Sequence, residues 1–383
     1  MALFSPKKKN IIGLDVGAGG LKLVEFGAEH GRARLHTYAF TERSAQGIEQ
    51  SLLDDTKATA ELVKKMMKEA KTTTTRVVAG LPIASVFSSI ISVPATTSSK
   101  ELKEAIEWQA KKLIPLPLEE MVLDWKMLGE EKKPSSARGR GLMEQKEVSQ
   151  FITGKPREGP PELGRKTVRV LLTGAAKALV AKYAELTKAA GLELVALETE
   201  AFALIRSLIG KDPSTIMLVD FGTLRTSLVI VKHGVPVLTR TINLGGVTMT
   251  RTMARTLGLP DDQAEQMKRD IHKLAGATGG GATGMPALLA KTLEPLITEI
   301  NYSLNLYKTQ QGEPAELVEK VILTGGSAHL PYLAAHISKQ ININAYVGDP
   351  WARVATHEDL RGVLDEVGPR FAVAIGLAMR DFE

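Results

Sequence analysis

Residues 12–22 read Ile-Gly-Leu-Asp-Val-Gly-Ala-Gly-Gly-Leu-Lys, and residues 218–228 read Leu-Val-Asp-Phe-Gly-Thr-Leu-Arg-Thr-Ser-Leu. Each stretch is an apolar run followed by Asp, an apolar residue, Gly, a turn of small residues and an apolar restart. This pattern predicts a β-hairpin that occurs twice, about two hundred residues apart. The backbone N–H groups of such a turn can face a phosphate, and the Asp can hold a metal ion, usually through water. Two facing hairpins could therefore clamp a nucleoside triphosphate between two similar lobes.

The composition is that of an ordinary globular protein with more than one domain. The chain has 383 residues, of which 44% are hydrophobic and 24% charged, and it has no cysteine. A disulfide framework and thiolate chemistry are therefore excluded. No run of about eighteen apolar residues suggests a transmembrane helix, and no apolar segment of signal-peptide length follows Lys7-Lys8-Lys9.

The net charge of +6 is modest, and the basic residues gather at positions 7–9 and 132–166. We interpret these stretches first as solvated, flexible segments, with contact to anionic lipid headgroups as the alternative. Nucleic-acid binding is not expected, because no aromatic residues interleave with the charges.

The periodicity predicts two α/β lobes and an insertion between parts of the first lobe. The predicted strands cover 11–16, 21–26, 34–40, 76–81, 86–93, 122–128, 167–173, 192–198, 216–221, 227–232, 235–243 and 320–324. The predicted helices cover 54–71, 100–113, 176–190, 199–209, 248–257, 261–274, 285–310, 330–340 and a short terminal helix at 371–379. Residues 129–166 and 276–284 are rich in Gly and polar residues and are expected to be flexible.

From this order we expect the following divisions. The first lobe takes residues 1–84 and 167–213, an inserted subdomain takes 85–166, the second lobe takes 214–247 and 318–366, a smaller subdomain on it takes 248–317, and 367–383 form a terminal helix that returns to the first lobe.

The two hairpins supply the candidate phosphate and metal contacts. Asp15 and Asp220 are the candidate Mg²⁺ carboxylates, acting through water, although either alone could simply cap its own turn. Lys22 could reach a phosphate as a point charge, or it could be a solvated residue at a strand end. The predicted phosphate-binding residues are Asp15, Gly17, Ala18, Gly19, Gly20, Lys22, Asp220, Gly222, Thr223 and Thr226.

Three further positions are chemical candidates. Gly325, Gly326 and Ser327 follow a strand and precede a helix, so a ring or sugar could lie close to the backbone there, although Gly-Gly alone often marks a tight turn. Glu200 begins a helix, where the helix dipole stabilises an acid in any case; positioning the attacking water in phosphoryl transfer is the functional alternative. Glu265 and Lys268 lie one helical turn apart and, on the residues alone, form a surface ion pair.

Together these motifs resemble the actin, Hsp70 and sugar-kinase superfamily, more closely the cell-division protein FtsA, and most closely the PilM family of type IV pilus assembly proteins. The resemblance covers the chain except 129–166. It rests on Lys7-Lys8-Lys9 before Ile11-Ile-Gly-Leu-Asp-Val-Gly, on Leu21-Lys-Leu-Val-Glu-Phe26, on Glu104-Ala-Ile-Glu-Trp-Gln-Ala-Lys-Lys-Leu-Ile-Pro115 with Asp124-Trp-Lys after it, and on Glu200-Ala-Phe-Ala203. It implies a two-lobed, actin-like (ribonuclease H-like) α/β fold that binds ATP and Mg²⁺, in which residues 86–166 replace the usual actin subdomain.

The resemblance also implies roles for the candidate residues. The two hairpins would flank the phosphates and Mg²⁺, Gly325, Gly326 and Ser327 would lie beside the adenosine, Glu265 and Lys268 would approach the ribose and base, and Glu200 would be the acid of the connecting segment. Two departures stand out: Ala18-Gly19-Gly20 replaces the usual serines or threonines, and Arg225 is an unexpected cation in the second turn. We therefore expect ATP binding with slow or no hydrolysis.

The resemblance further implies a cytoplasmic scaffold at the inner face of the inner membrane that serves type IV pilus assembly and twitching motility. It would bind the N-terminal cytoplasmic peptide of PilN in a groove between the first lobe and the inserted subdomain. Leu102, Ile106 and Leu113 are the candidate groove residues, although their apolar face could equally be core. Other components of the inner-membrane complex, pilus motor ATPases and a second copy of the chain are further candidate partners.

Two other functions remain open at this point. An FtsA-like division protein that binds membrane would carry a C-terminal amphipathic helix after a linker, whereas this sequence ends at Asp381-Phe-Glu directly after its terminal helix. A sugar or metabolite kinase of the same fold would need a catalytic Asp and a substrate pocket, and no convincing carboxylate motif for it is found.

Overall fold

The computed structural model describes residues 10–44, 47–96, 98–130, 167–270, 285–311 and 316–382. The chain divides into two compact units, one formed by residues 1–86 and 175–383 and one by residues 87–174. The inserted unit was expected to end at 166, and it extends to 174 because strand β7 (Thr167–Ala176) is the middle strand of its three-stranded sheet. Lys7-Lys8-Lys9 and most of the two stretches predicted to be flexible lie outside the described residues.

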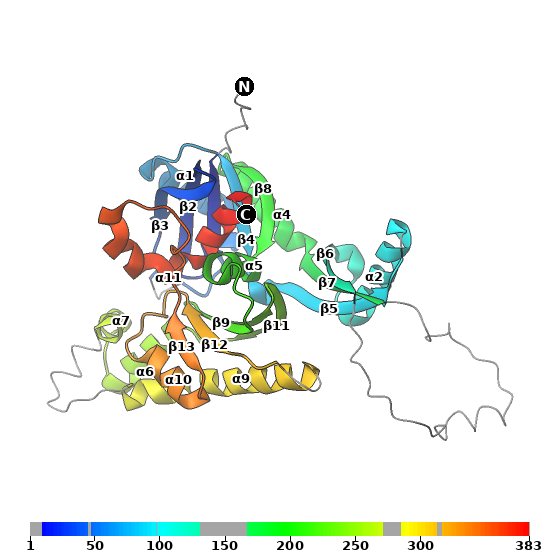
Figure 1. Ribbon diagram of the computed structural model, residues 1–383. Helices are drawn as coiled ribbons and strands as arrows, with labels where there is room; N and C mark the ends of the chain where they lie inside the picture. The colour runs from blue at the N-terminus through cyan, green and yellow to red at the C-terminus, as the bar shows by residue number, and fades with distance from the viewer. Residues whose placement is uncertain are drawn as a thin grey trace, which may run out of the picture. The chain divides into compact units, whose positions relative to one another are not determined.

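The first unit contains two five-stranded sheets with the same strand order (Figure 1). The first sheet has the order β3-β2-β1-β4-β8 and the second the order β11-β10-β9-β12-β13. In each sheet the hairpin's first strand is antiparallel to the second and parallel to the later strand beside it. The duplicated meander predicted from the sequence is thus confirmed.

The strands of the two sheets have the following bounds. The first sheet contains β1 (Ile11–Gly17), β2 (Gly20–Glu29), β3 (Arg32–Phe40), β4 (Arg76–Leu81) and β8 (Glu193–Thr199), and the second contains β9 (Ile216–Phe221), β10 (Thr226–Lys232), β11 (Val235–Ile242), β12 (Lys320–Thr324) and β13 (Asn344–Val347).

Helices α1 (Thr56–Glu69) and α4 (Lys177–Ala189) pack together on one face of the first sheet. Their apolar residues join Leu14 and Leu23 in a buried cluster. Asp55 caps α1 by accepting the N–H of Ala58 at 2.9 Å, which satisfies one of the free donors at the helix start. Helix α5 (Glu200–Leu204) continues as a π-helical turn to Ile209, so the single helix predicted over 199–209 has two parts.

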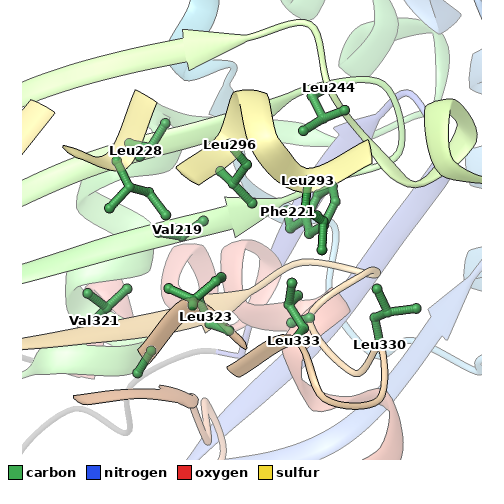
Figure 2. Close-up of a cluster of buried hydrophobic side chains, with 14 of the residues drawn as sticks. Val219, Phe221, Leu228, Leu244, Leu293, Leu296, Val321, Leu323, Leu330 and Leu333 are labelled. Carbon is green, nitrogen blue, oxygen red and sulfur yellow. The ribbon is translucent and has the colours of Figure 1, made fainter. Parts of the chain in front are cut away.

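The second sheet is covered by α6 (Gly246–Leu257), α9 (Ala287–Gln311) and α10 (Leu333–Ile341), with α7 (Asp261–Arg269) packed against α6. Figure 2 shows side chains of the sheet, α9 and the segment from β12 to α10 meeting in one core. Phe221, Leu293 and Leu323 are completely buried there. Burial of such side chains drives folding.

Helix α11 (Arg361–Ala378) begins ten residues before the predicted terminal helix at 371–379, so the expected division at 367 is also too late. The helix continues through Gly368 and Pro369, and the Pro369 carbonyl accepts from the hydroxyl of Thr324 at 2.9 Å. Glycines allow α11 to approach its neighbours closely. A Cβ at Gly13 of β1 would lie 2.7 Å from the backbone N of Ala378, and a Cβ at Gly376 would collide with the Ala203 carbonyl.

The second unit is a three-stranded sheet of order β5-β7-β6 with one long helix. Its elements are β5 (Val86–Pro94), α2 (Ser99–Leu113), β6 (Met121–Glu130) and β7 (Thr167–Ala176). Ser98 caps α2 by accepting the N–H of Glu101. Ile106 and Ala110 of α2 are fully buried in the core of this unit.

Short 3₁₀ turns at Leu52–Asp54, Ile83–Ser85, Leu118–Glu120, Glu358–Leu360 and Met379–Phe382 connect these elements. Over the ranges that the structure describes, no helix combines the length and the apolar character needed to cross a bilayer.

Candidate nucleotide-binding site

The turns of the two Asp-x-Gly hairpins lie against each other. A Cβ added at Gly19 would collide with the hydroxyl of Thr223, and a Cβ at Gly20, which has φ +135°, would collide with the Thr41 carbonyl. The Thr41 hydroxyl in turn accepts the N–H of Leu21 at 2.9 Å. The small residues of the first turn are therefore required for packing, which gives a physical reason for the missing serines and threonines.

Asp15 and Lys22 are paired directly across the first hairpin. The Lys22 Nζ lies 2.9 Å from the Asp15 Oδ2, and both side chains are largely buried. Lys22 is thus no solvated strand end. The equivalent position opposite Asp220 in the second hairpin is Ser227, so the two hairpins differ in charge as well as in their turns.

Glu200 lies in the first turn of α5, where Thr199 caps the helix. Its Oε2 accepts the backbone N–H of Ile83 at 3.0 Å. Burial and, after it, the negative charges of Asp15 and Asp220 together raise the pKa of Glu200 from 4.5 to about 8. The helix start alone would not produce this, so Glu200 belongs electrostatically to the hairpin carboxylates.

Asp220 shows the same effect. Burial, and next the charge of Asp15, raise the pKa of Asp220 to about 6, while Lys22 acts in the opposite direction. Three carboxylates thus share the charge of Lys22, and such a cluster favours a bound cation or proton. The buried Tyr183 of α4 also feels this cluster, because burial, Glu200 and Asp15 raise its pKa well above the ordinary value.

Mg²⁺ fits this donor set. Asp15 and Asp220 offer carboxylate oxygens, the ligands that Mg²⁺ prefers, and the cluster carries more negative charge than Lys22 neutralises. Within the described ranges no three His, Cys, Asp or Glu side chains are placed to ligate one metal ion directly, so the fit is to an ion that Asp15 and Asp220 would hold through water.

The second turn is tied to two Gly-Gly segments. The Gly222 N–H donates to the Arg225 carbonyl at 3.0 Å, and the Gly222 carbonyl accepts from the N–H of Gly246 at 3.0 Å and from the hydroxyl of Ser327 at 3.5 Å. The side chain of Arg225 is exposed. The N–H of Gly222, predicted to contact a phosphate, is therefore already used within the turn.

Thr226 is likewise committed. It is fully buried, and its hydroxyl donates to the Leu244 carbonyl at 2.6 Å. Its role in this structure is to fix the chain between β11 and α6. A phosphate contact from this hydroxyl would require that bond to break.

The turn at Gly325 approaches the metal side of the site. Gly325 has φ +89°, and a Cβ there would lie 2.5 Å from the Asp220 Oδ1, while its N–H donates to the Pro369 carbonyl at 3.0 Å. A Cβ at the next residue, Gly326, would meet nothing within 4 Å. The turn is therefore closed toward Asp220 and has open space beside Gly326, as a bound ring or sugar requires.

Lys268 is buried, which excludes a simple surface ion pair with Glu265. Its Nζ donates to the Gly246 carbonyl at 3.0 Å, the Thr250 hydroxyl at 2.8 Å and the Glu265 carboxylate at 2.6 Å. Burial lowers the pKa of Lys268, against the effect of Glu265. Glu265 also accepts from Thr250 and from Arg269. A Cβ at Gly246 would lie 3.5 Å from the Lys268 Nζ, so these predicted nucleoside residues meet at one place.

Sequence reasoning missed several residues of this site. Gly245 and Gly246 follow a strand and begin α6, which repeats the strand, Gly-Gly and helix pattern that singled out Gly325 and Gly326. That signal could have been used. Thr250 lies one turn further along α6, and no sequence motif marks it as a site residue.

The residues predicted for a partner groove do not share one surface. Ile106 is fully buried, whereas Leu113 is 44% exposed. Leu102 is intermediate. Ile106 therefore belongs to the core of the second unit and cannot contact a partner.

Two sheets of the same strand order, whose Asp-x-Gly turns meet beside a buried acid and two Gly-Gly segments, define the actin-like ATPase fold. The chain belongs to the family of the type IV pilus assembly protein PilM, since the model of that family matches residues 13–141 and 159–382. It is similar to the structure of the PilM-PilN type IV pilus biogenesis complex, at 28% identity and a TM-score of 0.75, with 99% of this chain and 100% of that chain covered.

Two further solved structures share the fold at low identity. One is the ethanolamine utilization protein EutJ from Carboxydothermus hydrogenoformans, at 13% identity and a TM-score of 0.52, covering 97% of this chain and 89% of that chain. The other is a diol dehydratase-reactivating factor in nucleotide free form, at 11% identity and a TM-score of 0.52, covering 98% of this chain and 100% of that chain. The actin-like fold that the resemblance implied is thus confirmed.

Proposed function

We propose that this PilM-family protein is an ATP- and Mg²⁺-loaded scaffold of the type IV pilus inner-membrane complex. In this proposal it lies at the cytoplasmic face of the membrane and binds the N-terminal cytoplasmic tail of a PilN protein. The observation that supports nucleotide binding best is the cluster of Asp15, Asp220 and Glu200 at the meeting hairpin turns. Mg²⁺ bound with ATP would neutralise this cluster and polarise the phosphate oxygens.

In this proposal, different residues of the chain would contact the Mg²⁺, the phosphates and the nucleoside. Asp15 and Asp220 would hold the Mg²⁺ through water, and the backbone of the first turn would donate to the phosphates. Lys268 and Glu265, fixed by Thr250 and the Gly246 carbonyl, would lie beside the ribose and base. Ordered groups of this kind bind without first losing conformational freedom.

Slow turnover follows from the state of Glu200. A carboxyl with a pKa of about 8 is largely protonated at neutral pH, and a protonated acid accepts no proton from an attacking water. Its Oε2 is also held by the Ile83 N–H. Because Mg²⁺ would lower this pKa, the low rate expected in the loaded protein rests on this hydrogen bond, which keeps Oε2 engaged.

Partner binding is supported by the similarity to the PilM-PilN complex and by the surface of the second unit. That unit exposes several large apolar side chains, and exposed apolar residues that gather on one small unit are typical of interaction sites. They are Trp108, Leu113, Leu116, Val122 and Met127, which are 44–58% exposed. We assign the tail contact to this inserted unit. The proposal also includes other pilus components, motor ATPases and a second copy of the chain as further binding partners of this protein.

The nucleotide part is tested by retention of ATP. Purified Asp220→Ala is expected to lose most of the ATP and Mg²⁺ that the unmodified protein retains, because the variant removes a metal-side carboxylate. Asp359→Ala is the matched control, since Asp359 is 87% exposed and forms an ion pair with the neighbouring His357. Equal nucleotide content in both variants would contradict the proposal.

The partner part is tested by pull-down with cytoplasmic tail peptides of inner-membrane pilus proteins, with and without Mg-ATP. Capture of the PilN tail alone is expected, and Leu113→Glu should abolish it. Leu317→Glu is the control, because Leu317 is 63% exposed in the other unit. Failure to capture any tail, or equal loss in both variants, would argue against this role.

A further inference from the structure

Arg43 makes an unusual set of contacts to the first hairpin turn. Its guanidinium donates to the carbonyls of Ala18 at 3.2 Å, Gln50 at 2.9 Å and Gly47 at 2.7 Å. Its backbone N–H donates to the carbonyl of Gly19 at 3.1 Å. Arg43 therefore grips two successive peptide groups of the turn and joins them to the segment 47–50.

These contacts set the direction of the turn's amide groups. The C=O and the N–H of one trans peptide point in opposite directions. Anchoring the Ala18 carbonyl to Arg43 therefore turns the N–H of Gly19 away from Arg43. A turn of Ala-Gly-Gly has little rigidity of its own, because glycine has the largest conformational freedom of any residue. The orientation must be imposed from outside the turn, and Arg43 imposes it.

We propose that Arg43 is the positioning residue of the first phosphate-binding turn. It holds the backbone N–H of Gly19 ready for a phosphate and so replaces the side-chain hydroxyls that close packing excludes from this turn. The inference rests on the proposed ATP binding and adds the residue that makes the first hairpin competent for phosphate. Arg43 acts through the turn and needs no contact with the nucleotide itself.

The segment 47–50 gives Arg43 a firm support. Ile48 is 3% exposed, and the Gln50 N–H donates to the Gly47 carbonyl at 3.1 Å. The planar guanidinium presents N–H donors in fixed directions and can bond carbonyls on two sides at once. A lysine ammonium on a flexible stem does not hold its donors in such a fixed geometry. The turn is thus anchored to a part of the lobe that is itself packed.

The same segment also reaches the second lobe. Glu49 forms an ion pair with Arg251 of α6 at 2.7 Å, with 69% and 37% of the two side chains exposed. Exposed pairs of this kind contribute little. The position of Glu49 therefore offers a control that breaks the contact between lobes without touching the hairpin turn.

The test compares affinities for Mg-ATP and for adenosine, measured by calorimetry on the full chain after nucleotide removal. Arg43→Ala is expected to bind Mg-ATP about tenfold more weakly or worse, since the Ala18 carbonyl loses its hydrogen bond to the charged guanidinium. Its affinity for adenosine should not change, because adenosine has no phosphate. Arg43→Lys should lose at least threefold for Mg-ATP only, and Glu49→Gln should stay within twofold for both ligands.

The outcomes separate the possible failures. If the unmodified protein binds adenosine and Mg-ATP with the same affinity or binds neither, the proposed function and this inference both fall. If it prefers Mg-ATP and Arg43→Ala keeps that preference, the inference alone is overturned. Equal losses for both ligands in Arg43→Ala would also overturn it, since they indicate a general structural role. Should Arg43→Ala not fold, the selective loss in Arg43→Lys decides the same question.

Discussion

The buried Glu200 makes the stability of the nucleotide-free protein depend on pH in an unusual direction. Its pKa is about 8 in the folded protein, against 4.5 in an unfolded chain. Between these values the folded state binds a proton that the unfolded state releases. The free energy of unfolding therefore falls as pH rises from about 4.5 to about 8, because the folded state binds more protons.

Glu200→Gln removes this dependence while keeping the shape of the side chain, and its amide oxygen can still accept the Ile83 N–H. A pKa difference of one is worth about 1.4 kcal/mol, so the change from 4.5 to about 8 sets an upper limit of about 5 kcal/mol. Side-chain relaxation and water around the carboxylate reduce the loss. We expect the variant to be more stable than the unmodified protein at pH 8.5 by about 2–4 kcal/mol.

The assay is urea unfolding at a series of pH values, on protein freed of nucleotide and divalent cations. The free energies of unfolding of the two proteins should diverge progressively as the pH rises from about 4.5 to about 8. The decline that remains below pH 6 in the variant belongs to Asp220, whose pKa is raised to about 6. Glu193→Gln is the control, because Glu193 is exposed at the start of β8. Parallel pH profiles for Glu200→Gln and the unmodified protein would refute the reasoning.

Two further predictions concern the buried positions Gly376 and Tyr183, and both are tested by urea unfolding at pH 7. Gly376→Ala should lower the free energy of unfolding by more than about 3 kcal/mol, since the new Cβ meets the Ala203 backbone. Gly362→Ala, with open space in the same helix, should raise it by up to about 1 kcal/mol, and similar losses in both would contradict the packing argument. Tyr183→Phe should raise it by about 1 kcal/mol, because the buried hydroxyl has no hydrogen-bond partner among the described residues. A loss of stability in Tyr183→Phe would mean that its hydroxyl is bonded after all.

The fold was largely predictable because its main signal is repeated. The apolar runs on either side of Asp15 and Asp220 have the length and alternation of strands, and each is followed by a small-residue turn. Strand β13 escaped prediction because Asn344–Val347 is short, partly exposed and follows a helix without a strong turn signal. The start of α11 was missed because Gly368 and Pro369 are residue types typical of a helix end, whereas in the structure the helix runs through both.

The sequence singled out most of the residues that the structure brings together at the candidate site, but few of their contacts. Spacing along the chain identified the carboxylates and the glycines, because these residue types are needed wherever a backbone approaches a phosphate. It could not show that Lys22 pairs with Asp15 or that Thr226 binds the Leu244 carbonyl, since both depend on register. Arg43 could not be identified from the sequence motifs, because its role depends on the contacts that its side chain makes in the folded protein.

The packing of α11 has a consequence for how the chain is made on the ribosome. Gly13 in β1 and Phe26 in β2 lie against this helix, whose residues are made about 350 positions later. At roughly 5–20 residues per second, an unfinished first lobe would wait on the order of half a minute with an apolar sheet face uncovered. We expect the nascent chain to need a chaperone during this interval. Messenger RNAs truncated before codon 361 should therefore yield an aggregation-prone product that proteases remove, so the helix acts as a check that synthesis has reached this point.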